Sequence, residues 1–214
     1  MIAPRWPRRR CRPRAGIAVA GLLLGALGCG SSKILMDWRE PAFAGPPLHK
    51  VLVVAVKNDP ARRRIWEDAF VSALAGYGAA ATSSYRLFPD ALPDTAAVVA
   101  AVREQHFEGI IVTHRVNTEQ VTRTIPGGTT SGPGTVVHDP FYGAYATVYR
   151  EVNAPDLVET DELVRDRTDV WELRGPARLL YQGYTESTNP ESATAIAGEL
   201  TRLVVPRWRT GHIF

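Results

Sequence analysis

Cysteine is scarce in this chain, which has only Cys11 and Cys29 among its 214 residues. Two cysteines allow at most one intramolecular disulfide and cannot form a zinc site built from cysteines alone. The histidines show no HxH, HExxH or other metal-binding spacing. They are His49, His106, His114, His138 and His212. We therefore expect neither a metal site nor a cofactor.

The chain also lacks an apolar run long enough to cross a membrane. Its longest uncharged apolar run, Ala15–Leu27, has thirteen residues, whereas a spanning helix needs about twenty. No acidic residue precedes Asp37, and six arginines fall within the first fourteen positions. A basic segment followed by a short apolar run is typical of a signal peptide, which we place at residues 1–28.

The apolar run closes with Ala26-Leu27-Gly28-Cys29. This segment resembles the lipobox of bacterial lipoproteins, although Ala26 stands where that family prefers leucine. The resemblance implies cleavage before Cys29 and its modification with diacylglycerol and palmitate. By similarity to enterobacterial sorting, Gly30 in place of aspartate implies an outer-membrane lipoprotein whose domain faces the periplasm. The alternatives are an ordinary cleaved signal and an uncleaved anchor helix.

Removal of residues 1–28 changes the charge and the cysteine content of the chain. It takes away six positive charges and no negative ones, so the net charge falls from +3 to −3. A mildly acidic protein has no bulk attraction for nucleic acid, and we expect no such partner. Only Cys29 remains, which excludes an intramolecular disulfide.

We expect a tether at residues 29–48, where several prolines and glycines interrupt any periodicity, and a single α/β domain at 49–214. Strand-like and helix-like patterns alternate at the start of that domain, which predicts a βαβαβ core with parallel strands. The expected strands are Val51–Val56, Thr82–Phe88 and Gly109–Thr113, with helices starting at Asp59-Pro60 and at Asp94 or Thr95.

The second half predicts an antiparallel extension and a C-terminal helix. His114–Ile125 alternates as an extended antiparallel strand would, and the Gly-rich Pro126–Gly134 is expected to be a loop. Arg174–Ala177 carries a hairpin-turn signal. Asn189-Pro190 is expected to start a final amphipathic helix. The apolar stripe of that helix comprises Ala193, Ile196, Ala197, Leu200 and Val204.

Several of these segments resemble a family of small bacterial lipoproteins of unknown function, over roughly residues 34–210. The matching segments are Trp38 to Phe43, Val51–Val56, Arg63–Phe70 and Gly109–Thr113. The order of elements is more distantly similar to peptidoglycan-synthase activator lipoproteins, the curli-export lipoprotein and the TolB amino-terminal domain. Because those relatives bind envelope partners, the resemblance implies a binding module and not an enzyme.

Two charged segments allow more than one interpretation. Arg62–Arg64 lies in the first turn of a helix, where acidic residues are favoured, which suggests an anionic partner such as lipid headgroups or a glycan. The interpretation that we favour is a solvated face paired with Glu67 and Asp68. A second segment, rich in carboxylates, suggests calcium binding, although a solvated strand face is the preferred interpretation. Its members are Asp156, Glu159, Asp161, Glu162, Asp166 and Asp169.

The predicted partner contact lies just after the Gly-rich loop. It consists of Phe141, Tyr142 and Tyr145, whose aromatic side chains suit an interface. The alternative is that these side chains pack in the core.

We expect a non-catalytic binding or scaffolding module whose partner is an envelope protein or glycan. A self-assembling structural subunit and an envelope hydrolase remain as alternatives. An exposed sheet edge would favour self-assembly, and a deep pocket with clustered acids or histidines would favour a hydrolase.

Overall fold

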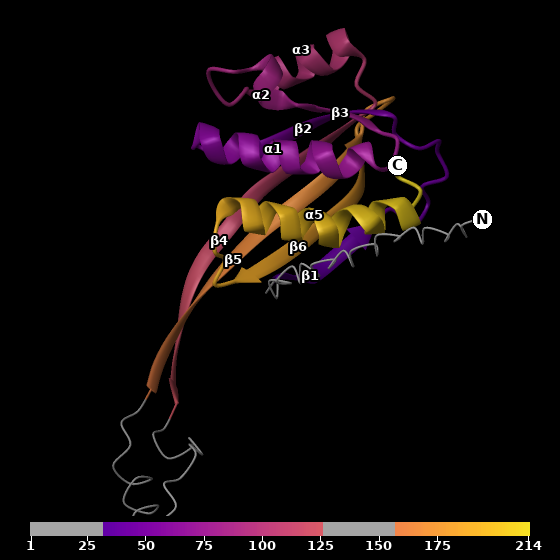
Figure 1. The fold of residues 1–214 in the computed structure, drawn as a ribbon. Coiled ribbons are helices and arrows are strands. Elements are labelled where there is room, and N and C mark those ends of the chain that lie inside the picture. Colours follow the sequence, from indigo (N-terminus) through magenta and orange to yellow (C-terminus); the bar gives the residue numbers. More distant parts are fainter. Residues whose placement is uncertain (1–31, 126–156) are drawn as a thin grey trace, which may run out of the picture.

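The computed structural model describes residues 32–125 and 157–214 (Figure 1). Their centre is a six-stranded mixed sheet in the order β1-β6-β5-β4-β2-β3. β2 pairs in parallel with β3 and β4, and the remaining neighbours are antiparallel. The strands are β1 (Ser32–Arg39), β2 (Lys50–Val56), β3 (Ala80–Ser83), β4 (Gly109–Ile125), β5 (Leu157–Glu172) and β6 (Arg178–Thr188).

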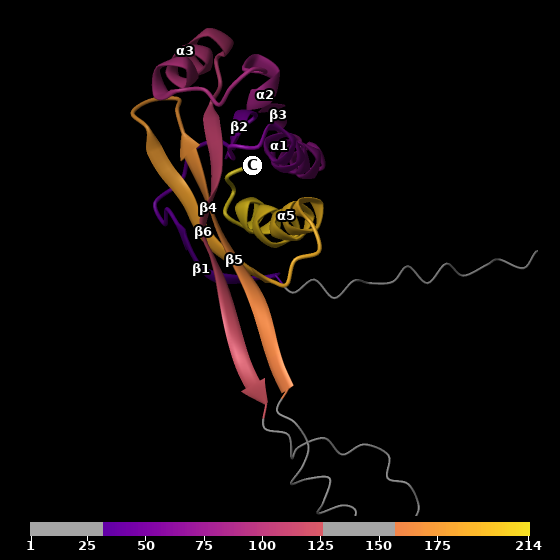
Figure 2. The same ribbon diagram turned by 90° about the vertical axis from the view of Figure 1, so that its left-hand side faces the viewer.

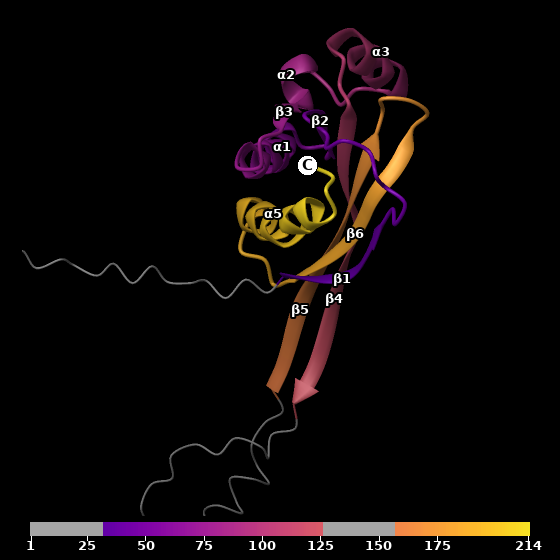
Figure 3. The ribbon, with the colours of Figure 1, turned by 90° about the vertical axis from the view of Figure 1, so that its right-hand side faces the viewer.

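Helices cover both faces of this sheet, as Figures 2 and 3 show. The helices are α1 (Pro60–Ala75), α2 (Ser84–Leu87), α3 (Thr95–Gln105) and α5 (Ala193–Thr210). The main core lies between α1, α5 and one face of the sheet, and a smaller core lies under α3 on the other face. None of the helices in residues 32–125 and 157–214 is long and apolar enough to span a membrane. The predicted α/β class, with a βαβαβ core, an antiparallel extension and a C-terminal helix, is confirmed.

Helix α1 forms where the sequence predicts it, because its capping residues satisfy its first backbone amides. The Asp59 carboxylate accepts hydrogen bonds from the amides of Ala61 and Arg62, and Pro60 has no amide to satisfy. Trp66 and Phe70, one turn apart, are 1% and 0% exposed and belong to the main core. Both residues pack on the sheet as the apolar stripe predicts.

The first departure from prediction is β1. Its eight residues, Ser32–Arg39, pair antiparallel with β6 and form one edge of the sheet, whereas an irregular tether was expected there. The same tether prediction also places Leu48 outside the domain, yet this residue is 1% exposed in the main core. The prediction failed because a partner strand 150 residues away decides whether this segment is extended and paired.

Further departures concern strand lengths and helix starts. Thr82–Phe88 is not one strand, since β3 ends at Ser83 and the short helix α2 follows. Gly109–Thr113 and His114–Ile125 form one continuous strand, β4, whose first part pairs with β2 and whose whole length pairs with β5. Helix α5 is capped by Ser192, whose hydroxyl accepts from the Ala195 amide, and not by Asn189.

Candidate functional site

A cleft among the described residues lies at the carboxyl end of β2, beside His114 and Arg115 in the middle of β4. Its volume is about 960 Å³, and it is bounded by the amino-terminal ends of α1 and α5 and by β5. In α/β sheets this end of the parallel strands is where ligands commonly bind. The lining includes Lys57, Arg62, Trp66, His114, Arg115, Glu162 and Glu191.

Two cations that line the cleft, Lys57 and Arg115, share one carboxylate, that of the buried Asp166. Lys57 Nζ donates to Asp166 Oδ1 over 2.8 Å, and Arg115 Nη2 lies 3.2 Å from Asp166 Oδ2. The Asp166 side chain is 1% exposed and that of Lys57 is 8% exposed. One buried carboxylate therefore balances two cations and leaves one positive charge uncompensated within this cluster.

Burial and an aromatic ring fix the environment of Lys57. Its ammonium lies 4.1 Å from the centroid of the Trp66 ring, a cation–π contact. Burial lowers the pKa of Lys57 below its usual 10.5, while the nearby Asp166 carboxylate opposes that shift. The position of the amine is therefore fixed by its contacts with Trp66 and Asp166.

The sequence analysis did not select Lys57, Arg115 or Asp166 as a cluster. Lys57 directly follows β2, and the sheet register places Val56 beside His114, so Arg115 is its neighbour on the adjacent parallel strand. In the sequence, Lys57 and Arg115 come shortly after the two expected parallel strands, Val51–Val56 and Gly109–Thr113, which is a usable signal for such a site. Asp166, from the acidic segment, could be found only through its pairing with Arg115 across β4 and β5.

The acidic segment is therefore not simply a solvated face. Asp166 and Asp169 are 1% and 6% exposed, and Asp169 pairs with Arg167 at 2.7 Å. Asp161 pairs with Arg123 at 2.6 Å. Within residues 32–125 and 157–214, no three His, Cys, Asp or Glu side chains are placed to hold a metal ion.

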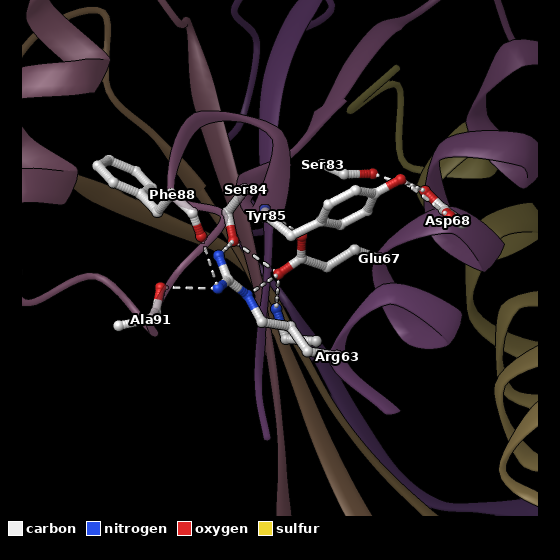
Figure 4. A network of polar contacts seen from close by, with 9 residues as sticks. Arg63, Glu67, Asp68, Ser83, Ser84, Tyr85, Phe88 and Ala91 are labelled. Atoms are coloured by element: carbon white, nitrogen blue, oxygen red, sulfur yellow. Dashed lines mark hydrogen bonds and ion pairs between the residues drawn. The ribbon is translucent and has the colours of Figure 1, made fainter. Parts of the chain in front are cut away.

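The three arginines at the start of α1 have separate roles, as Figure 4 shows for Arg63. Arg63 is 4% exposed; its Nε donates to Glu67 Oε1 at 3.1 Å and its Nη1 donates to the backbone oxygens of Phe88 and Ala91. Arg62 lines the cleft, and Arg64 lies 5.5 Å from the ring centroid of Tyr85. Because Arg63 is buried, the three arginines do not form one cationic surface for an anionic partner.

Glu67 is the centre of that buried network. Its Oε1 accepts from Arg63, from the Ser84 hydroxyl at 2.6 Å and from the Ala55 amide, and its Oε2 accepts from the Tyr85 amide. The predicted pairing of the arginines with Glu67 is correct for Arg63. The network joins α1, β2 and α2, and so holds α1 and β2, which line the cleft, in place against α2.

The other predicted site residues lie apart or outside the described structure. Cys29 and the aromatic residues Phe141, Tyr142 and Tyr145 fall in segments that are not described, as do His138 and Asp156. Of the histidines in residues 32–125 and 157–214, only His114 lines the cleft. The predicted partner contact therefore stays a prediction.

No protein-family model matches the sequence, and no curated protein matches it. Among solved structures, a PelC dodecamer from Paraburkholderia phytofirmans is similar at 11% identity, with a TM-score of 0.42. A point variant of that dodecamer has 9% identity and a TM-score of 0.39. Both comparisons cover 86% of this chain and 99% of the other chain. Scores of this size carry no conclusion about function.

Proposed function

We infer that this protein is a non-catalytic lipoprotein of the bacterial cell envelope that binds an acidic glycan segment in the cleft. The lipid on Cys29 would hold it at the outer membrane, facing the periplasm. The observation that carries the binding role is the cluster of Lys57 and Arg115 on the single carboxylate of Asp166. A ligand carboxylate or other anionic group would complete the charge balance of this cluster.

The rim of the cleft favours a sugar over a free phosphate. Asp59, Glu162 and Glu191 line the same cleft, so a compact anion would meet three carboxylates as well as the cations. A chain of uronic acids offers both kinds of group. Its carboxylate can accept from Arg115 and Lys57, and its hydroxyls can donate to Glu162 and Glu191.

The test is isothermal titration calorimetry of the lipidated protein in detergent micelles with tetragalacturonic acid. The methyl ester of the same oligomer is the uncharged control. Arg115→Gln should weaken binding by about tenfold, the effect of losing one charged hydrogen bond. Arg178→Gln should leave affinity unchanged, since Arg178 also faces a single carboxylate but lies near the opposite hairpin, 4.0 Å from Glu172.

Equal affinity for the acid and its ester, or for the wild type and Arg115→Gln, would contradict the proposed anion site. Shortening of the oligomer during the titration would contradict the non-catalytic role and favour the hydrolase alternative. Mass spectrometry of the ligand after each titration distinguishes that outcome from simple binding.

Self-assembly is a second candidate function, favoured by β1. This strand is one edge of the sheet, and its exposed residues Met36 and Trp38 are 64% and 44% accessible. An edge strand with apolar side chains can pair with another chain. Native mass spectrometry should show oligomers that Met36→Lys dissociates and that Val99→Lys, on the exposed side of α3, does not. A monomer in the wild type would reject this candidate.

A further inference from the structure

Lysine is rare in this chain, since only three of its 25 basic residues are lysines: Lys33, Lys50 and Lys57. The side chain of Lys33 is 64% exposed and pairs with Glu186. Lys50 donates to the backbone oxygen of Gln105. Lys57 is the one lysine that lines the cleft, and its side chain is 8% exposed. The cleft therefore holds a single, nearly buried primary amine.

The partners of Asp166 allow this amine to lose its proton. Arg115 Nη2 lies 3.2 Å from Asp166 Oδ2, and Arg115 Nε lies 3.4 Å from Oδ1. Because arginine stays protonated in proteins, Arg115 and Asp166 form a neutral pair by themselves. A protonated Lys57 adds one uncompensated positive charge to that pair, and a neutral Lys57 adds none. The neutral amine therefore leaves no buried charge without a partner.

The environment of Lys57 favours the neutral form further. Burial lowers the pKa of Lys57, the charges of Arg115 and Arg62 act in the same direction, and Asp166 opposes them. A lysine that is desolvated and lies beside another cation is the kind that attacks carbonyl carbons. The contact with the Trp66 ring, 4.1 Å from the amine, limits the positions that the amine can take.

We propose that Lys57 forms a reversible imine with the carbonyl carbon of a 2-oxo acid whose carboxylate is held by Arg115. Sugars with a ketone next to the carboxylate, the ulosonic acids, are the glycan members of this class. The inference rests on the anion site of the proposed function and adds a covalent step to it.

The geometry selects a carbonyl that is adjacent to a carboxylate. Lys57 Nζ and Arg115 Nη2 each lie within 3.2 Å of an oxygen of the same carboxylate, so the amine and the guanidinium are close neighbours. Arg115 uses Nε and Nη2 for Asp166, and its other N–H groups can hold a ligand carboxylate. A ligand that carries its carbonyl one bond from its carboxylate can reach both groups at once.

The step is balanced and needs no reagent besides the 2-oxo acid. A C–N bond forms between Lys57 Nζ and the carbonyl carbon, and the bond from that carbon to oxygen breaks. The oxygen leaves as water with two protons of the ammonium group. The product is a protonated imine, so the positive charge beside Asp166 is retained. Asp166, 2.8 Å from Nζ, can accept the first of these protons and return it to the departing oxygen.

The test is reductive trapping on the full-length lipidated protein in detergent micelles. Pyruvate is the probe because it is a small 2-oxo acid, and sodium cyanoborohydride converts its imine into a stable secondary amine. Mass spectrometry of peptides then measures the adduct on each of the three lysines. Lys33 and Lys50 serve as controls within the same molecule, so the comparison does not depend on the folding of a variant.

We expect several-fold more adduct on Lys57 than on Lys33, the reverse of the order that exposure would give. Methyl pyruvate lacks the carboxylate charge, so the ratio of Lys57 adduct to Lys33 adduct should fall by about tenfold. Lys57→Arg should abolish the cleft adduct while retaining a cation for anion binding. Lys50→Arg, the matched control, should leave the Lys57 adduct unchanged.

Labelling in the order of exposure, or equal ratios for pyruvate and its methyl ester, would overturn the imine. Binding of tetragalacturonic acid without an adduct on Lys57 would overturn the imine alone. The absence of both would overturn the imine and the proposed function together. An adduct on Lys57 without galacturonate binding would support the imine and reject the uronic-acid ligand.

Discussion

Lys57 and Asp166, 109 residues apart in the chain, form an ion pair of 2.8 Å in which both side chains are under a tenth exposed. Asp166 also forms an ion pair with Arg115, so its carboxylate contacts two cations at once. Asp166→Asn should destabilise the fold by about 3–5 kcal/mol, because it leaves two cations without their carboxylate.

Urea unfolding of the two proteins measures this change. Asp90→Asn, at an exposed aspartate between α2 and α3, is the control and should stay within about 0.5 kcal/mol of the wild type. If the free energy of unfolding of Asp166→Asn also stays within about 0.5 kcal/mol of the wild type, the ion pair adds nothing to stability.

Binding of an anionic ligand should weaken as the pH rises toward 10.5. Burial lowers the pKa of Lys57, so the folded protein loses this proton at a lower pH than an ordinary lysine does. Calorimetric titrations across the alkaline range, with circular dichroism to confirm folding, should show the decline in the wild type and not in Lys57→Met. Identical profiles for the two proteins would exclude Lys57 from the site.

The same shift has a defined sign for stability. The folded pKa lies below the unfolded one, so the unfolded chain binds more protons between them. The contribution of Lys57 to the free energy of unfolding should therefore rise with pH across that window. The difference in unfolding free energy between the wild type and Lys57→Met measures it, and a fall with pH would contradict the shift.

Phe70→Ala should destabilise the domain by about 3–5 kcal/mol through lost burial and a cavity. Phe70 is fully buried, and its ring stacks on Trp208 of α5 with centroids 5.8 Å apart. The substitution therefore loosens the contact between α1 and α5 as well as that with the sheet. Chemical unfolding measures the loss, with Val99→Ala as the exposed control. Similar stabilities for the two variants would contradict the assigned core.

Cys29→Ser should abolish the attached lipid and leave either unprocessed precursor or protein released from the membrane. Each buried methylene of an acyl chain contributes about 0.8 kcal/mol, so two or three chains hold a protein almost permanently. Mass spectrometry and membrane fractionation check the outcome. Processing and membrane association like those of the wild type would reject the lipoprotein assignment, and wild-type protein in the inner membrane would reject only the sorting.

Local patterns in the sequence determined much of this fold. The continuous apolar run of β2, the Asp59-Pro60 start of α1 and the stripe of α5 each depend on residues within a few positions of one another. The turn at Arg174–Ala177 is equally local and joins β5 to β6 as predicted. From these elements the βαβαβ order and the parallel core follow.

Only the tertiary structure decided the edge strand β1, the continuity of β4 and the membership of the cleft. Each depends on partners far away in the chain: Ser32 needs Ser187, and Lys57 needs Asp166. A strand is stabilised by its neighbours more than by its own residues, so β1 has no local signature. A buried ion pair likewise exists only where the fold removes both groups from water and brings them into contact.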